Sequence, residues 1–361
     1  VTNTRTVYYT NTHPRALRRG CYFRTDFDSK KTVEKAYLYA SAKGLYVPYL
    51  NGRRITEDRF IPGSMEKVTE YQVYDVTGFI RNGSNVLAAE TGSGWYNCES
   101  WGTLGINRPA LMMCLEIHYA DGSSQTVETN ESWLCSVSPR IEDDIQYGER
   151  YDARLEIDGW NDKAAPTGNW QKAELATKNF EPFENQTYPA VRIQNEVTAT
   201  NIGTLADGTV YYDFKYNSTG RAKIVLRNTK PGERVIIRYC EIIENGVPYV
   251  GTYGDVFFEQ DTKADGISPY GVRNIDVYIC KGAKEEVYMP EFAFTGFRYV
   301  YISGYSGEYE LSTVIKVEMN TDLDVIGDIV TSHSGISRIW DAVKRSWRSN
   351  IFTGPIDCPT R

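Results

Sequence analysis

Hydrophobic and polar residues alternate over short stretches along most of the chain, as half-buried β-strands require. The clearest alternation has its apolar positions at Leu111, Met113, Leu115, Ile117 and Tyr119. Asp121-Gly122 then supplies a turn pair that tolerates positive φ, and a return strand follows. This pattern predicts a β-hairpin over 110–128, with His118 as a surface residue on the less apolar face beside Glu116.

The same alternation recurs in the second half of the chain. Residues 222–227 and 234–239 alternate on either side of Lys230-Pro231-Gly232, which predicts a second hairpin. A further strand is expected at 297–302. Turn residues recur roughly every 8–12 positions, and no Gly-x-Gly-x-x-Gly or Walker sequence occurs. The chain is therefore predicted to be mainly β, with two antiparallel β-sandwich domains of the jelly-roll type.

One segment near the end has a helical period instead. Its apolar positions are Ile336, Ile339, Trp340, Val343 and Trp347, with charged residues between them. Ser334 is the expected cap at the start, and Gly354-Pro355 closes the segment. We expect an amphipathic helix over 334–350.

A polar stretch at 164–189, interrupted by Pro166, Gly168, Pro182 and Pro189, is expected to be either a linker or a final irregular strand of the first domain. We expect an N-terminal sandwich at 1–189 and a second sandwich at 190–320. Residues 321–361 are expected to form a linker followed by the helix.

Composition and charge exclude several classes of protein. The 361 residues are 41% hydrophobic and 24% charged, which is unlike a disordered chain. A formal net charge of −7 argues against nucleic acid as a partner, and no apolar run reaches the roughly 18 residues of a membrane span. Val1 does not open a secretory signal segment, so the sequence leaves a cytoplasmic and a periplasmic location open.

Cysteine and histidine usage argues against a disulfide framework or a metal centre built on these residues. The seven cysteines are scattered and never spaced as Cys-x-x-Cys, and only three histidines occur. Buried, reduced thiols are the expected state. Cys358 is expected to be a packed thiol rather than a nucleophile, because no histidine lies near it in sequence to act as a base.

Several stretches, taken in order, resemble the α-L-rhamnosidases of glycoside hydrolase family 78. The resemblance covers nearly the whole chain and rests on the order of the blocks more than on any one of them. The blocks are Phe23–Phe27, Leu45–Arg54, Tyr74–Thr77, Gly92-Ser93-Gly94-Trp95-Tyr96, Tyr147–Arg154, Gly159-Trp160, Tyr212–Phe214, Arg238–Glu241 and Phe294–Val300.

The sharpest element of the resemblance is Pro355-Ile356-Asp357-Cys358-Pro359-Thr360-Arg361. It is similar to the family's Thr-Asp-Cys-Pro-x-Arg run, with Ile356 in place of the usual threonine. That run stands at the entrance of the family's catalytic (α/α)6 barrel. The resemblance therefore implies that the predicted helix is the first helix of such a barrel.

The resemblance also implies an inverting glycosidase, in which one carboxylic acid protonates the leaving oxygen and a second carboxylate activates water. Both proton-transfer residues are expected beyond Arg361, so no catalytic residue is assigned within 1–361, and this portion alone is expected to be inactive. Asp357 is expected to accept hydrogen bonds from rhamnose hydroxyls, the alternative being a loop aspartate that caps a turn. Arg361 either donates to the same sugar or holds the carboxylates in place.

Aromatic residues cluster in a polar loop of the first domain. Trp95, Tyr96 and Trp101 could stack on sugar C–H surfaces, as in family members whose sandwich domain is a rhamnose-binding module with bound calcium. The alternative is that Trp95 and Tyr96 pack inward. No cluster of six or more oxygen ligands stands near this turn, so no metal ligand is assigned and a calcium ion stays an open alternative.

Three readings of function follow. The chain is the accessory β-sandwich portion of a rhamnosidase acting on a rhamnose-containing carbohydrate, or a non-catalytic carbohydrate-binding protein, or a pair of sandwiches that only brace a barrel. The ending at Asp357–Arg361 favours the first and third together. The sequence leaves the natural rhamnoside and the oligomeric state open.

Overall fold

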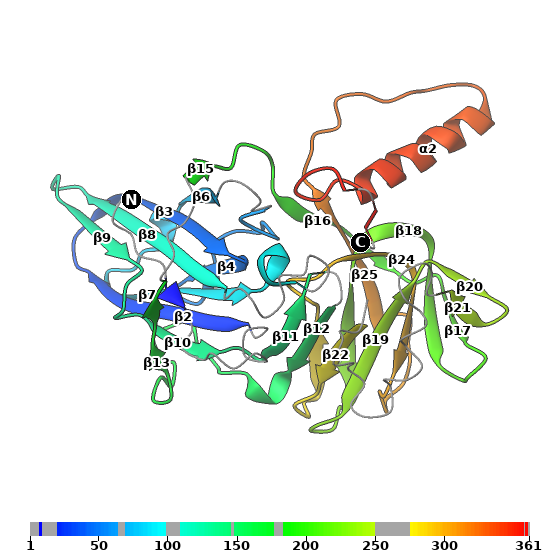
Figure 1. Cartoon of the computed structure of the whole chain (residues 1–361), viewed down its shortest axis with the longest axis horizontal. Helices are drawn as coiled ribbons and strands as arrows, with labels where there is room; N and C mark the ends of the chain where they lie inside the picture. Colours follow the sequence, from blue (N-terminus) through cyan, green and yellow to red (C-terminus); the bar gives the residue numbers. More distant parts are fainter. Residues whose placement is uncertain are drawn as a thin grey trace. The chain divides into compact units, whose positions relative to one another are not determined.

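The computed structural model describes residues 7–8, 20–63, 69–98, 109–145, 148–176, 183–249, 275–356 and 358–359. The chain divides into two compact units. Unit 1 comprises residues 1–144 and 155–188, and unit 2 comprises residues 145–154 and 189–361. Both units consist mainly of β-strands, as the alternation predicts (Figure 1).

Unit 1 contains two sheets. One has the order β14-β1-β8-β3-β6-β15 with β9 on β8, and the other has the order β13-β10-β2-β7-β4-β5. The strands of the first are β1 (Val7–Tyr8), β3 (Val33–Lys43), β6 (Thr69–Asp75), β8 (Ala110–Tyr119), β9 (Ser124–Glu128), β14 (Glu174–Leu175) and β15 (Phe183–Asn185). Those of the second are β2 (Cys21–Ser29), β4 (Leu45–Leu50), β5 (Arg53–Arg54), β7 (Gly83–Gly92), β10 (Leu134–Val137) and β13 (Gln171–Lys172). The unit also holds β11 (Arg140–Asp144) and the short 3-10 helices η2 (Thr77–Phe79) and η3 (Gly94–Asn97).

The hairpin predicted over 110–128 is confirmed. Strands β8 and β9 pair antiparallel, with Ile117 opposite Gln125, and the turn between them uses a positive φ at Gly122. His118 is exposed, whereas Leu115 and Ile117 are fully buried. The local alternation therefore matches the burial at 115–119, whereas over 110–114 both faces of the strand are buried, including Met112 and Cys114.

Unit 2 is built around one large sheet with the strand order β12-β22-β19-β24-β18-β25-β16, and β17 and β23 pair with β18. Strands β20 and β21 form a separate two-stranded ribbon. The strands are β12 (Gly148–Asp152), β16 (Val191–Thr198), β17 (Asn201–Thr204), β18 (Val210–Arg227), β19 (Arg234–Cys240), β20 (Ile242–Glu244), β21 (Val247–Tyr249), β22 (Ile275–Ile279), β23 (Glu285–Tyr288), β24 (Thr295–Ser303) and β25 (Val314–Thr321). The fully buried core of the unit includes Tyr212, Phe214, Ile224, Phe297 and Val300.

The second predicted hairpin, over 222–239, is wrong in its pairing. Both strands exist, but β24 lies between β18 and β19 and is hydrogen-bonded to each. The connection at Lys230-Pro231-Gly232 therefore does not join sheet neighbours. Strand β24, some 70 residues further along the chain, lies between them instead. Pairing along both of its edges satisfies its backbone hydrogen bonds and buries Val300 and Ile302 in the core of the unit.

Residues 145–154 belong to unit 2, although they lie far upstream of the rest of it. Strand β12 pairs in parallel with β22, with Tyr151 opposite Tyr278, and the 3-10 helix η4 (Ala153–Leu155) follows. The side chain of Glu149 accepts hydrogen bonds from the backbone of Glu291 (2.8 Å) and Phe292 (2.5 Å). Its own N–H donates to the buried carboxylate of Asp276 (2.8 Å). These bonds hold the early segment in the later sheet.

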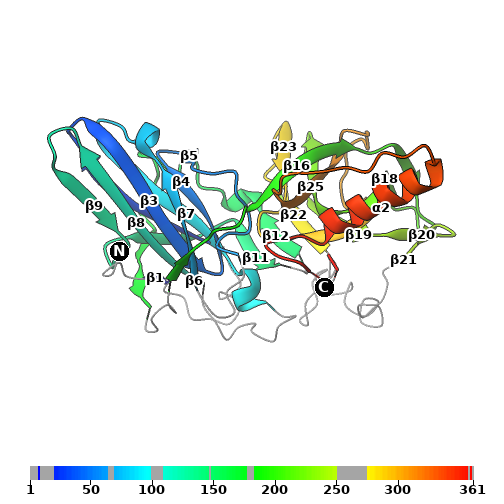
Figure 2. The ribbon, with the colours of Figure 1, turned by 90° about the horizontal axis from the view of Figure 1, so that it is seen from above.

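The predicted helix is confirmed as α2 (Ser334–Ser349), which lies along β18 and β25 (Figure 2). The expected cap is wrong, however. Ser334 already has helical backbone, and the extended residue before it, His333, is the N-cap, with its ring accepting from the N–H of Ile336. The apolar stripe is largely exposed: the exposed fraction is 66% for Ile339 and 51% for Trp347.

Candidate functional site

The structure describes only some of the residues expected at the site. Asp357, Arg361 and Trp101 lie outside the described residues. Trp95, Tyr96 and Cys358 lie within them. Of the seven cysteines, which form no disulfide, six are buried and Cys358 is partly exposed, in agreement with reduced thiols.

The segment that leads into the Asp-Cys-Pro-x-Arg run is hydrogen-bonded to the sheet of unit 2. Ile351 and Thr353, which follow α2, are both bonded to Thr321 at the end of β25. The carbonyl of Ile351 accepts from the N–H of Thr321 (3.1 Å), and the N–H of Thr353 donates to the hydroxyl of Thr321 (3.0 Å). Ile351 and Pro355 form an isolated bridge that closes a small loop. The end of strand β25 thus anchors the beginning of the run.

An aromatic contact fixes the same segment. The ring of Phe352 is fully buried and stacks on Phe294, with ring centroids 3.8 Å apart and planes inclined by 19°. Stacked aromatic pairs contribute roughly 0.5–1.5 kcal/mol beyond the burial of their area. Phe294 begins the Phe-Thr-Gly-Phe block that leads into β24, so the core of unit 2 holds the chain five residues before Asp357.

Two residues of neighbouring strands hold the two ends of this segment. Thr219 on β18 donates its hydroxyl to the carbonyl of Ser349 (2.6 Å). Gly296 on β24 donates its N–H to the carbonyl of Pro359 (3.1 Å). Thr219 and Gly296 are paired across the two strands. Analysis of the sequence gave neither residue this role, although a glycine between bulky strand residues is a signal of close backbone approach.

The Gly-Trp-Tyr turn of unit 1 forms η3 directly after β7. The N–H of Ser93 donates to the buried carboxylate of Asp143 (2.6 Å), which fixes the start of the turn. Gly94 has φ +54°, and a Cβ there would lie 2.7 Å from the Leu45 side chain. Glycine is therefore required at this position both for its backbone conformation and for space.

Trp95 and Tyr96 are each half-buried, which does not decide between the two expectations for them, sugar stacking and inward packing. The Lys43 ammonium lies 5.6 Å from the centroid of the Tyr96 ring. Sugar binding by these rings stays a prediction.

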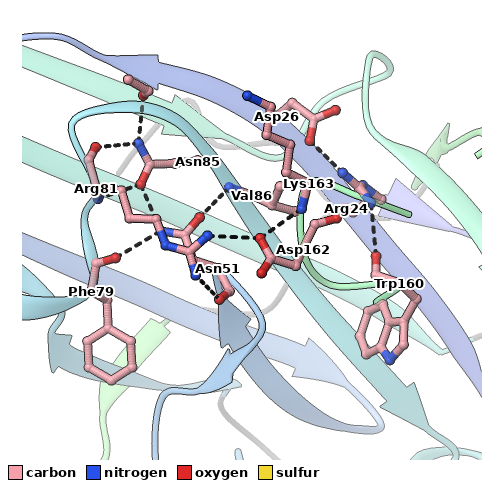
Figure 3. Close-up of polar contacts among 11 residues, drawn as sticks. Arg24, Asp26, Asn51, Phe79, Arg81, Asn85, Val86, Trp160, Asp162 and Lys163 are labelled. Carbon is pink, nitrogen blue, oxygen red and sulfur yellow. Dashed lines mark hydrogen bonds and ion pairs between the residues drawn. The ribbon is translucent and has the colours of Figure 1, made fainter. Parts of the chain in front are cut away.

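A second cluster of polar residues in unit 1 is shown in Figure 3. The Asn51 amide donates to the Phe79 carbonyl and to Asn85 Oδ1 (2.8 Å each) and accepts from the N–H of Val86 (2.9 Å). The Asn85 amide donates to the carbonyls of Arg81 and Gly83. Every donor and acceptor of these two buried amides is used by protein groups, so the cluster is structural rather than ligand-binding.

The same cluster fastens the loop that contains the Gly159-Trp160 block. Buried Arg24 donates to the carbonyls of Trp160 (3.1 Å) and Asp162 (3.0 Å), as Figure 3 shows for Trp160. The Trp160 ring stacks on Tyr22 with centroids 3.8 Å apart. Partial burial raises the pKa of Asp162, but the Lys163 N–H and the Arg81 guanidinium outweigh it, and the net pKa lies below its usual range. The N–H of Gly52 also donates to the carbonyl of Asn161 (2.9 Å), so the block at 45–54 is hydrogen-bonded to the loop that holds the block at 159–160.

Within the described parts of the chain, no group of three or more histidine, cysteine, aspartate or glutamate side chains could hold a metal ion. A calcium site therefore stays untested. Over the same residues, no helix has the length and apolar character needed to cross a membrane.

Two family models match the chain in order. The alpha-L-rhamnosidase N-terminal domain matches residues 31–195, and the bacterial alpha-L-rhamnosidase concanavalin-like domain matches residues 203–320. The alpha-L-rhamnosidase of Streptomyces avermitilis is 31% identical over 339 residues, which cover 92% of this chain and 31% of that relative. The alpha-L-rhamnosidase of Alteromonas sp. is 28% identical over 354 residues and covers 94% of this chain and 36% of its own length.

Solved structures agree with these matches. The S. avermitilis enzyme in complex with L-rhamnose has a TM-score of 0.85 at 30% identity, over 95% of this chain and 32% of that one. The two units are therefore β-sheet domains of the kind found in a class of glycoside hydrolases. More particularly, the chain belongs to the α-L-rhamnosidase family by its N-terminal and concanavalin-like domains. It spans about a third of the length of the curated relatives it matches.

Proposed function

We propose that the chain is the accessory β-sheet portion of an α-L-rhamnosidase that hydrolyses terminal α-L-rhamnosyl residues of glycosides or polysaccharides. The observation that carries the proposal is that two rhamnosidase domain models match 31–195 and 203–320 in order, with the Asp357–Arg361 run following them. An L-rhamnose complex of a relative with 30% identity supports the substrate class.

In this proposal the reaction inverts the anomeric carbon. A general acid protonates the leaving oxygen while a general base activates water on the opposite face of the sugar, and both are supplied by chain beyond Arg361. Asp357 accepts hydrogen bonds from rhamnose hydroxyls and orients the ring beneath the acid. Arg361 donates to the same sugar or to the catalytic carboxylates.

The exposed stripe of α2 supports a barrel after the second sheet unit. Ile336, Ile339, Val343 and Trp347 are each about half exposed or more, although helices normally bury such a face. We propose that α2 is the first helix of an (α/α)6 barrel and that the following helices cover this stripe.

The test is hydrolysis of an aryl α-L-rhamnoside by the complete protein, with the anomer of the released sugar followed by proton NMR. We expect β-L-rhamnose as the first product. In the complete protein, Asp357→Asn should lower kcat/KM by roughly a hundredfold or more, because each charged hydrogen bond to a hydroxyl contributes roughly 1.5–3 kcal/mol. Activity of Asp357→Asn near the parent value would make Asp357 structural, and no hydrolysis by the complete protein would overturn the proposal.

The non-catalytic alternative makes a separate prediction. If unit 1 is a carbohydrate-binding module, residues 1–361 bind L-rhamnose in a calorimetric titration, and Trp95→Ala with Tyr96→Ala abolishes the binding. Titrations with and without calcium test the ion at the same time. On the accessory reading, residues 1–361 hydrolyse no aryl rhamnoside.

A further inference from the structure

We infer that the cross-strand pair Thr219–Gly296 of unit 2 positions the segment that presents Asp357, so that the second sheet unit is part of the active-site framework rather than a spacer. This inference rests on the proposed function and extends it to two residues that do not themselves touch substrate. Thr219 and Gly296 are positioning residues.

The pair holds both ends of one segment. Thr219 Oγ1 binds the carbonyl of Ser349 at the end of α2, and the Gly296 N–H binds the carbonyl of Pro359, two residues after Asp357. Thr219 and Gly296 lie opposite each other on β18 and β24. Residues 349 and 359 are therefore hydrogen-bonded to two directly paired positions of the same sheet. An eleven-residue segment whose two end residues are held in this way has few conformations left.

The approach at Gly296 permits no larger residue. A Cβ on Gly296 would lie 2.5 Å from Cγ and 3.2 Å from Cβ of Pro359. Gly296 does not have a positive φ, so the requirement for glycine here comes from the contact and not from the backbone conformation. Pro359 is buried in this contact, and an added methyl group has to push the segment away.

Contacts inside the segment also hold Ile356, the residue before Asp357. The N–H of Ile356 donates to the carbonyl of Asn350 (2.9 Å), and Phe352 stacks on Phe294. The chain is therefore held on both sides of Asp357, at Ile356 and at Pro359. Groups that orient a substrate lose large rate factors when they move by about 1 Å, which makes such anchoring relevant to catalysis.

Gly296→Ala and Thr219→Val test the inference, with Gly354→Ala as the matched control. Gly354 lies in the same segment, but a Cβ there meets nothing within 4 Å. In residues 1–361, the rate of alkylation of Cys358 reports the docking of the segment, since the other six cysteines are buried. We expect alkylation to become at least tenfold faster in Gly296→Ala and Thr219→Val and to stay at the parent rate in Gly354→Ala.

In the complete enzyme, we expect kcat/KM for an aryl α-L-rhamnoside to fall at least tenfold in Gly296→Ala and to be partly restored in Gly296→Ala/Pro359→Ala, which removes the Cγ atom of the clash. Restoration by a change on the segment separates positioning from a general loss of folding. If Gly296→Ala fails to fold, the alkylation rate and kcat/KM are both measured on Thr219→Val, which keeps the side-chain volume and removes the hydrogen-bond donor.

Parent-like alkylation in both variants would overturn the inference, because the pair would then not hold the segment. Faster alkylation with unchanged kcat/KM would overturn it too, because the held segment would then not matter to the substrate. If the complete parent protein hydrolyses no rhamnoside but the variants are alkylated faster as expected, the proposed function is wrong. The conclusion that Thr219 and Gly296 hold the segment is then still supported.

Discussion

The ammonium nitrogen of Lys316 lies 2.8 Å from the carbonyl oxygen of Phe297, inside the core of unit 2. It also donates to the carbonyl of Tyr216 (2.9 Å) and lies 4.8–5.9 Å from the ring centroids of Phe214, Tyr216 and Phe297. Lys316 itself is fully buried. Burial lowers its pKa to about 7, against the opposing effect of the carboxylates of Glu318 and Asp213.

This lysine should make the stability of unit 2 depend on pH in the alkaline range. Its pKa is lower in the folded chain than in the unfolded chain, so the unfolded chain binds more protons between about pH 7 and 10. We therefore expect the free energy of unfolding to rise with pH across this range, by on the order of 1 kcal/mol per pH unit. Urea titrations at pH 7, 8 and 9 measure the slope.

Lys316→Met should remove this contribution to the slope, while the exposed Lys230→Met serves as control. An identical slope in the parent and Lys316→Met would show that the buried amine does not titrate in this range.

Glu286 should stabilise unit 2 in the opposite pH range. Burial raises the pKa of this carboxylate, but hydrogen bonds from the N–H groups of Ala283, Lys281 and Gly282 and from the hydroxyls of Thr229 and Tyr278 outweigh it and bring the pKa to about 2. A depressed folded-state pKa gives stability that is fully present above about pH 5 and is lost as pH falls toward 2.

We expect Glu286→Gln to lower the free energy of unfolding by roughly 1–3 kcal/mol at pH 7, because the amide cannot accept all of these bonds. The difference between parent and variant should shrink between pH 5 and 2.5 in urea titrations. A difference that does not change with pH would mean that the loss comes from packing and not from the charge.

The Asn51–Asn85 cluster should be a main support of unit 1. Asn85→Ala removes a partner from the partly buried carbonyls of Arg81 and Gly83 and one of the two acceptors of the buried Asn51 amide, so we expect a loss of roughly 2–4 kcal/mol. Thermal unfolding followed by tryptophan fluorescence measures it. The control Asn195→Ala removes one exposed hydrogen bond and should change stability by no more than about 0.5 kcal/mol. Equal losses in the two variants would contradict a structural role for the cluster.

Phe352 should stabilise the segment at 350–356 without stabilising the rest of unit 2. Phe352→Ala removes the stacked ring from Phe294, and we expect faster amide hydrogen exchange over 350–356 with unchanged exchange in β19 and β22. Uniformly faster exchange throughout unit 2 would show instead that Phe352 belongs to its global core.

Part of the candidate site was visible in the sequence, through the resemblance of 355–361 to a family run and through the Gly-Trp-Tyr turn. What the sequence analysis missed is what holds the run: it gave no such role to Thr219, Gly296 or Phe294, which lie 55 or more residues upstream of it. Their role depends on which strands are neighbours, and no local pattern encodes that. Asp357, Arg361 and Trp101, which lie outside the described residues, remain predictions.

The sequence by itself determined the features that depend on neighbouring residues. Alternation and the Asp121-Gly122 turn produced the β8–β9 hairpin, and a 3.6-residue period produced α2, because each rests on contacts within about twenty positions. Only the tertiary structure decided that β24 separates β18 from β19, that 145–154 joins unit 2, and that Gly296 meets Pro359. Strands with similar patterns can pair in many orders, and the order that forms is the one in which the whole sheet buries its apolar face and satisfies its backbone hydrogen bonds together.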